Sequence, residues 1–174
     1  ENELCSLLED GNDVILFGSE PFESLPTSFR ISLAGRTSGN LATVINDHPS
    51  LGYMPHDGFC GWQFAKMMEG GNAVCFETDE VPFNPIIEVV STHKYVIRQA
   101  ALFEFNVGNG RLLVCSFDFK DDDSASTWFK NQLISYAESD NFNPKDTITT
   151  AQLRGLINSK VKKAAANTNI AFNP

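Results

Sequence analysis

The sequence lacks the closely spaced cysteine and histidine residues that bind zinc or exchange disulfides. Its four cysteines, Cys5, Cys60, Cys75 and Cys115, form no Cys-x-x-Cys pair, so we expect no metal cluster. Cys75 and Cys115 lie inside short apolar runs, where a thiol usually acts as a small buried hydrophobic group. A disulfide is the alternative in an oxidising compartment, and the cysteines therefore leave the compartment open.

Long apolar runs and excess positive charge are also missing. No run approaches the ~18 apolar residues that cross a bilayer, so we expect no membrane insertion. The formal net charge of −9 would repel phosphate backbones, so we expect no nucleic-acid partner. No signal peptide is recognisable, and the chain starts with Glu1 rather than Met. We therefore expect Glu1 to follow a cut point, with any targeting sequence upstream.

The sequence lacks a complete catalytic motif. A cysteine hydrolase needs its thiol on a strained turn between a strand and a helix, with a histidine in reach, and no Gly-x-Cys-x-Gly motif is present. The aspartates at 118 and 121–123 do not have the spacing of an EF-hand, so a solvated helix start is expected there. Acidic residues at 77, 79, 80 and 88 could pair across a cleft for glycoside chemistry, although most such residues are solvated charges. We predict no catalytic residue, bound metal or cofactor.

A β-hairpin is the strongest structural signal that is present. Two apolar runs flank Gly108-Asn109-Gly110, and Asn-Gly between such runs is typical of a hairpin turn. Residues 112–117 are almost continuously apolar, as in a strand that is covered on both faces. On the first run one face is predicted to carry Ala101, Phe103, Phe105 and Val107.

A helix over residues 124–137 is expected to cover this hairpin. Its apolar stripe consists of Trp128, Phe129, Gln132, Leu133 and Tyr136. The aspartates at 121–123 precede it, where the helix dipole favours negative charge.

The remaining pattern alternates strands with helices. Strands are expected at residues 13–18, 41–45 and 73–76, and at 84–90, where Pro85 permits an edge strand or a strand start. Helices are expected at residues 2–9, 62–68 and 149–166. This order predicts an α/β fold with a mixed, mostly parallel sheet and helices on both faces. We expect an α/β module at 1–139, a helical extension of the same domain at 140–166, and a tail or linker at 167–174.

The irregular segment before residue 62 holds the candidate ligand or interface residues. Cys60 lies just before the expected helix 62–68, whose N-terminus would lower a thiol pKa, and His56 and Asp57 are close in sequence. Residues four positions apart on one loop rarely face each other, which argues against catalysis. Phe59 and Trp62 could stack on a sugar ring or anchor a helix in the core.

Several motifs together carry a family resemblance. HPSL, MPHDGFCGWQF, FNPIIEVV, ALFEFNVGNGRLLVCSFDF and SASTWFKNQL follow one another between about residues 13 and 137. In this order they resemble the C-terminal α/β module of some glycoside hydrolase family 2, β-galactosidase-like proteins of saccharolytic bacteria. The resemblance implies a flavodoxin-like or class I glutamine amidotransferase-like fold without the catalytic triad. It also implies a periplasmic or extracellular location.

The chain departs from that resemblance at two positions. Related modules carry a small polar residue at the place of Cys60 and a second Trp at the place of Phe64, so neither a thiol nor a Trp pair is required there. The hydrolytic glutamates of family 2 enzymes belong to a barrel domain that this chain does not resemble. Catalytic residues are therefore not carried over.

Three functional hypotheses follow. The first is a non-catalytic accessory module of a carbohydrate-degrading enzyme, which packs against the catalytic domain of its parent polypeptide or a neighbouring subunit. The second is a sugar-binding module that uses Trp62, Phe59 and His56, and the third is a cysteine hydrolase centred on Cys60. The first hypothesis predicts an exposed apolar patch near Met54, Phe59, Phe64 and Phe83.

Overall fold

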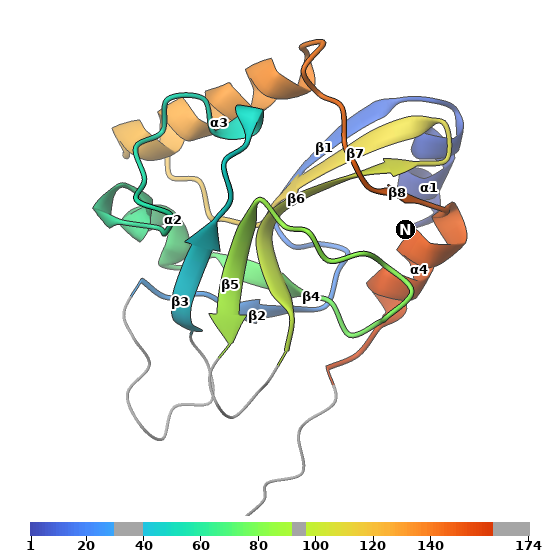
Figure 1. The fold of residues 1–174 in the computed structure, drawn as a ribbon, viewed down its shortest axis with the longest axis horizontal. Coiled ribbons are helices and arrows are strands. Elements are labelled where there is room, and N and C mark those ends of the chain that lie inside the picture. The colour runs from blue at the N-terminus through green and yellow to red at the C-terminus, as the bar shows by residue number, and fades with distance from the viewer. Residues whose placement is uncertain (30–39, 92–96, 162–174) are drawn as a thin grey trace, which may run out of the picture.

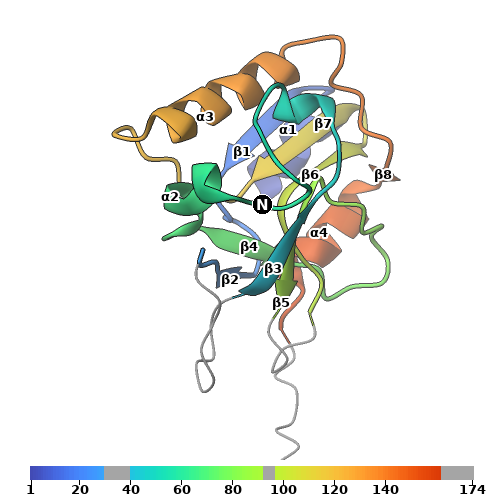
Figure 2. The same ribbon diagram turned by 60° about the vertical axis from the view of Figure 1, so that its left-hand side comes forward.

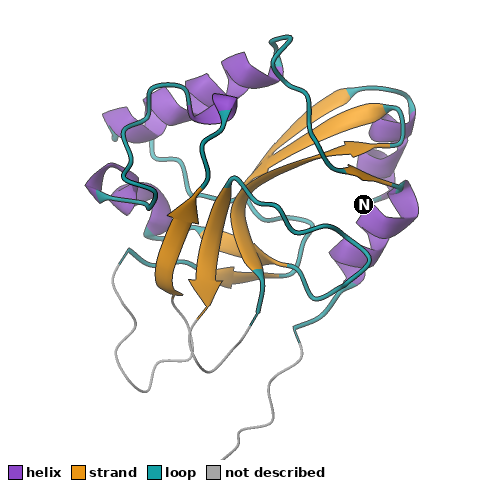
Figure 3. Cartoon of the chain, viewed as in Figure 1, coloured by secondary structure: helices purple, strands orange, loops and turns teal. Residues whose placement is uncertain are grey.

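A computed structural model describes residues 1–29, 40–91 and 97–161 of the chain. The helices, including two short 3-10 helices, are α1 (Asn2–Glu9), η1 (Pro49–Leu51), η2 (Trp62–Phe64), α2 (Ala65–Met68), α3 (Ser124–Ala137) and α4 (Thr150–Asn158). The strands are β1 (Asp13–Phe17), β2 (Ser24–Pro26), β3 (Asn40–Ile45), β4 (Asn72–Cys75), β5 (Ile87–Ser91), β6 (Gln99–Val107), β7 (Gly110–Cys115) and β8 (Thr147–Ile148). Figure 3 shows them as one strongly twisted sheet with helices at both sides.

β6 is the central strand of the sheet and pairs with β4, β5, β7 and β8. Along one of its edges lie β7 and then β4, and along the other lie β5 and then β8. The order β1-β7-β6-β4-β2 forms the main path, and β3 extends the sheet beyond β5. β6 is the longest described strand, so different partners share different parts of its length.

The expectation of a mostly parallel sheet was wrong. Among the described strands, only the β1–β7 and β6–β8 pairs are parallel, and the other pairs are antiparallel. A parallel pair needs a long crossover, usually through a helix. The alternation of strands and helices along the sequence suggested such crossovers, but α1 precedes the first strand and no helix lies between β4 and β7 in the described residues. The class remains α/β with a mixed sheet.

The predicted hairpin is confirmed, and its turn differs in detail. β6 and β7 pair from Leu102 with Cys115 to Val107 with Gly110, which leaves Gly108 and Asn109 as a two-residue loop. Gly108 has a φ of 62°, and a two-residue hairpin loop of type II′ places glycine at this first position. The turn therefore depends on Gly108, while Gly110 belongs to the strand.

Helices cover both faces of the sheet, as predicted (Figure 2). On one face α3 buries Phe129, Leu133 and Tyr136 in a core with Cys115 of β7. Trp128, which was expected on this stripe, is instead largely exposed.

The opposite face carries α1 and α4. Leu8 of α1 and Leu153 of α4 pack with Phe103 and Phe105 of β6 in a second core. Ala101, which was expected on the same face as Phe103, belongs to the α3 side.

Strand and helix ends show further differences from the sequence expectations. β1, in the place of the strand expected at 13–18, pairs with β7 at the sheet edge and is only half-buried. β5 begins after Pro85 and lies between β3 and β6, so the proline marks a strand start. α4 ends at Asn158 because Ser159 is extended, well before the expected end at 166. The expected tail at 167–174 lies outside the described residues.

Candidate functional site

The loop between η1 and η2 presents the residues that the sequence singled out. Its path is fixed by hydrogen bonds to β3: the Ile45 amide donates to the Gly58 carbonyl at 2.8 Å, and the Cys60 amide donates to Thr43 Oγ1 at 2.8 Å. The Gln63 side chain also donates to the Pro55 carbonyl. Side chains on this loop are therefore displayed from a well-anchored backbone.

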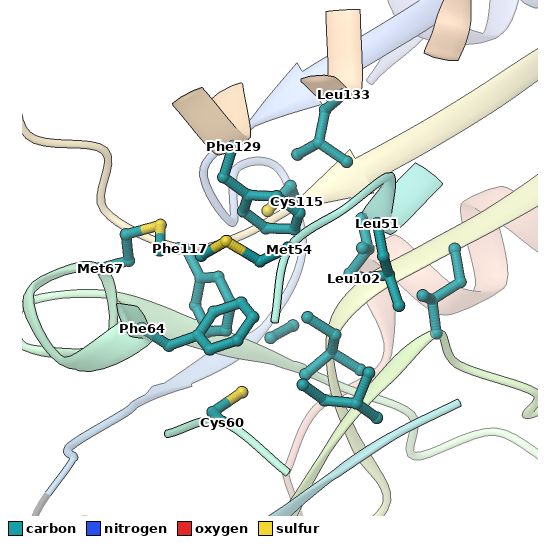
Figure 4. Close-up of a cluster of buried hydrophobic side chains, with 14 of the residues drawn as sticks. Leu51, Met54, Cys60, Phe64, Met67, Leu102, Cys115, Phe117, Phe129 and Leu133 are labelled. Atoms are coloured by element: carbon teal, nitrogen blue, oxygen red, sulfur yellow. The ribbon is translucent and has the colours of Figure 1, made fainter. Parts of the chain in front are cut away.

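Cys60 points into the core. Its side chain lies among apolar groups beneath the loop (Figure 4), and the residue is only 7% exposed. Burial raises the pKa of the thiol to about 12, although a hydrogen bond with Thr43 acts in the opposite direction. A nucleophilic cysteine needs a lowered pKa and access to substrate, so the geometry of Cys60 argues against a catalytic thiol.

His56 and Asp57 do not form a site with Cys60. His56 Nδ1 accepts a hydrogen bond from the Gly58 amide at 3.3 Å, and its Nε2 lies 3.8 Å from the Asp47 carboxylate. Asp57 is exposed. The contacts of His56 therefore stabilise the conformation of the loop between η1 and η2.

Two aromatic side chains of this loop, and Trp62 where the loop joins η2, are exposed. Tyr53 is 95% exposed, Trp62 84% and Phe59 51%. We call these three residues the aromatic face. The expectation of a patch at Met54, Phe59, Phe64 and Phe83 was wrong in part, because Met54 and Phe64 lie in the core (Figure 4) and Phe83 is half-buried.

Trp62 forms one wall of a shallow hollow. Its ring packs against Phe29 with 4.9 Å between the ring centroids. Charged side chains surround the two rings in a hollow of about 440 Å³, namely Lys66, Glu69, Lys120 and Asp122. An aromatic platform beside polar groups is a surface on which a flat apolar face with polar edges can bind.

The structure also assembles a cluster that the sequence reasoning missed. The Tyr136 hydroxyl of α3 donates to Glu104 Oε2 at 2.8 Å, and His48 Nε2 lies 3.4 Å from Glu104 Oε1. Burial, followed by the bond to Glu104, raises the pKa of Tyr136 above its ordinary value. The signal in the sequence was Glu104 itself, a single charge within the apolar run of β6.

Three of the acidic residues that the sequence singled out have structural contacts. Asp123 caps α3, where its carboxylate accepts from the Ser126 amide at 3.0 Å. Asp118 pairs with Lys120, and Asp79 pairs with Arg98 at 2.9 Å. In the part of the chain that is described, no group of three or more His, Cys, Asp and Glu residues could hold a metal ion.

One protein family corresponds to this chain. The model of the family described as "Domain of unknown function (DUF8487)" matches residues 1–158, which includes every element described above. No curated protein matches the chain.

Proposed function

The chain belongs to this family of unknown function, and we propose that it is a non-catalytic accessory module of a carbohydrate-degrading enzyme. In this role it packs against the catalytic domain of a glycoside hydrolase family 2, β-galactosidase-like polypeptide or against a neighbouring subunit. The observation that supports the proposal best is the aromatic face, Tyr53, Phe59 and Trp62, on one anchored loop.

The aromatic face has the properties of an interface. Tyr and Trp dominate binding energy at protein interfaces because they bury a large area with few rotatable bonds. Two such rings more than four-fifths exposed within ten residues leave much apolar area in water. Because the loop is hydrogen-bonded to β3, a partner would order few additional groups on binding.

The absence of a fitting thiol site is consistent with a non-catalytic role. Cys60, the candidate nucleophile of the cysteine-hydrolase hypothesis, is buried with a raised pKa. A nucleic-acid partner is disfavoured by the net charge of −9. None of the described helices is long and apolar enough to span a membrane.

The finer fold assignment is part of the same proposal. The family resemblance implies a flavodoxin-like or class I glutamine amidotransferase-like module in the periplasm or outside the cell. Helices on both faces of a mixed sheet agree with such a fold, whereas the predominance of antiparallel pairs argues against a close relationship.

A packing role is testable in the longer polypeptide that the proposal requires. Hydrogen exchange at residues 53–62 should be slower there than in the isolated chain, which should self-associate in sedimentation velocity. The double substitution Tyr53→Ser and Trp62→Ser should abolish both effects without changing the melting temperature. Trp128→Ser, at a side chain that is 41% exposed on α3, is the matched control. Equal exchange in the two proteins would contradict the proposal.

Carbohydrate binding is a second candidate, and the hollow beside Trp62 favours it. A pyranose ring could stack on Trp62 while Lys66, Glu69 and Asp122 bond its hydroxyls. Trp62→Ala should then weaken retention in affinity electrophoresis on soluble polysaccharide gels by at least about tenfold, since stacking contributes about 1.4 kcal/mol or more. Retention that is equal for Trp62→Ala and the unmodified chain would exclude this site.

A further inference from the structure

The sheet opens beside the centre of β6. On one edge of this strand, β5 pairs as far as Leu102, and β8 begins opposite Asn106. β5 runs antiparallel and β8 parallel to β6, so the two strands run away from each other along this edge (Figure 1).

A hollow of about 480 Å³ lies at this divergence. Its polar walls come from segments far apart in the sequence, namely Asp47 and His48 after β3, Asn84 before β5, Glu104 of β6, and Lys145 and Asp146 before β8. We call it the strand-gap pocket. Its volume is in the usual range for small-molecule sites, about 300–1,000 Å³.

Glu104 is held rigidly at this pocket. Its side chain is 8% exposed and accepts the Tyr136 hydroxyl at 2.8 Å. The Ser50 amide donates to His48 Nδ1 at 3.3 Å, and His48 Nε2 lies 3.4 Å from Glu104 Oε1. A carboxylate in a fixed orientation can select a ligand without further ordering.

The lining favours a neutral ligand with many hydroxyl groups. Two of the carboxylates already have partners, since Asn84 donates to Asp146 at 3.0 Å and Tyr136 donates to Glu104 at 2.8 Å, whereas the Asp47 side chain is fully exposed. The free lone pairs of these oxygens still accept hydrogen bonds, which hydroxyl groups can donate. Three carboxylates would repel an anion, and among the described residues no group of three or more His, Cys, Asp and Glu could hold a metal ion.

We propose that the strand-gap pocket, with Glu104 at its centre, binds a small neutral polyhydroxylated molecule such as a monosaccharide or a cyclic polyol. Asn84 and Lys145 supply donors for the ligand's oxygens, and Glu104, Asp47 and Asp146 accept from its hydroxyl groups. The pocket shares no lining residue with the hollow beside Trp62. The inference goes beyond the proposed packing role and does not depend on it.

Titrations of the whole chain with D-glucose, D-galactose and myo-inositol, followed by amide chemical shifts in NMR, test the proposal. At least one compound should shift the amides of His48, Asn84, Glu104 and Asp146 in a saturable way. Shifts confined to residues near Trp62, or saturation only with phosphate or spermidine, would overturn it.

Substitutions test whether the ligand binds in the strand-gap pocket. Glu104→Gln keeps the size of the side chain, and Asn84→Ala changes an exposed residue whose loss does not threaten folding. Each should raise the Kd by at least about tenfold, as expected when a hydrogen bond to a charged or convergent group is lost. Asn131→Ala, at an exposed residue of α3 that lines neither hollow, is the control and should leave the Kd unchanged. If Glu104→Gln fails to fold, Asn84→Ala decides, and an unchanged Kd in that variant would reject the pocket.

Discussion

Neighbouring residues on the loop between η1 and η2 face opposite ways, and this decides their chemistry. Tyr53, Phe59 and Trp62 are exposed, whereas Met54 and Cys60, each next to one of them in the chain, are buried. Burial removes water from the thiol and therefore favours its neutral form. The same stretch of chain therefore exposes aromatic rings to solvent and keeps the Cys60 thiol buried, where it is a poor nucleophile.

Cys60 should therefore be inert in the folded chain. Its pKa of about 12 leaves almost no thiolate at pH 8, and the thiolate is the species that reacts. Iodoacetamide at pH 8, with sites mapped by mass spectrometry, should label Cys60 only after addition of denaturant. Rapid labelling of Cys60 in the native chain, at a rate above that of a free thiol, would contradict this prediction and revive the cysteine-hydrolase hypothesis.

The ends of the elements depend on local contacts. Thr149 caps α4 with a complete capping box, in which Gln152 bonds back to the Thr149 amide at 2.8 Å. Gly110 lies in β7 where the backbone leading into β1 comes close. Single substitutions at these positions therefore test how much one helix or one strand contributes to the stability of the chain.

Loss of the cap should weaken α4. Thr149→Ala removes the side chain that accepts from the Gln152 amide, so the free energy of unfolding in urea should fall by about 1 kcal/mol. Thr150→Ala, one residue further into the helix, is the matched control and should have little effect. Equal losses in the two variants would argue against the capping box.

Replacing glycine by alanine should change the stability of the chain in opposite directions in β7 and in α4. An added Cβ at Gly110 would lie 2.3 Å from the Asn12 carbonyl oxygen and 2.9 Å from that of Leu8. Gly110→Ala should therefore destabilise the chain by about 1–3 kcal/mol. Gly155, within α4, has nothing closer than 4.0 Å, so Gly155→Ala should stabilise it by about 0.5–1 kcal/mol. Urea titrations compare both variants, and effects of the same sign would contradict this account.

At the scale of the whole molecule, two cores hold the twisted sheet between α3 on one face and α1 with α4 on the other. Cys60 and Cys115 belong to the first core and Cys75 packs within β4. All four cysteines are free and buried. Ionisation of these thiols therefore makes the free energy of unfolding depend on pH.

The free energy of unfolding should fall in alkaline solution. Burial raises the pKa values of Cys60, Cys75 and Cys115 from 9.0 to about 12. The stabilisation is complete below pH 9 and is lost as pH rises towards 12, because the unfolded thiols release their protons first. Each contributes a slope of about 1.4 kcal/mol per pH unit in this interval.

Cys115→Ala isolates one such contribution. Denaturant unfolding under reducing conditions, measured between pH 9 and pH 11, should show a shallower slope for this variant than for the unmodified chain. Tyrosine and lysine titrations are common to both proteins and cancel in the comparison. Identical slopes would mean that Cys115 ionises equally in the folded and unfolded states.

Sequence alone determined the features that depend on neighbours in the chain. The hairpin around Gly108 and the helix Ser124–Ala137 follow from turn chemistry and helical periodicity, and the structure has both. The placement of helices on both faces followed from the continuous apolar run of β7, which needs cover on each side.

Tertiary structure decided strand direction, the orientation of the loop aromatics and the strand-gap pocket. Parallel and antiparallel neighbours can have the same apolar pattern, so the pairing depends on connections between distant segments. Periodicity does not apply to the irregular loop, so nothing in the sequence separated exposed Trp62 from buried Phe64. Glu104, His48 and Tyr136 meet only because β6, the end of β3 and α3 pack together, which local sequence does not encode.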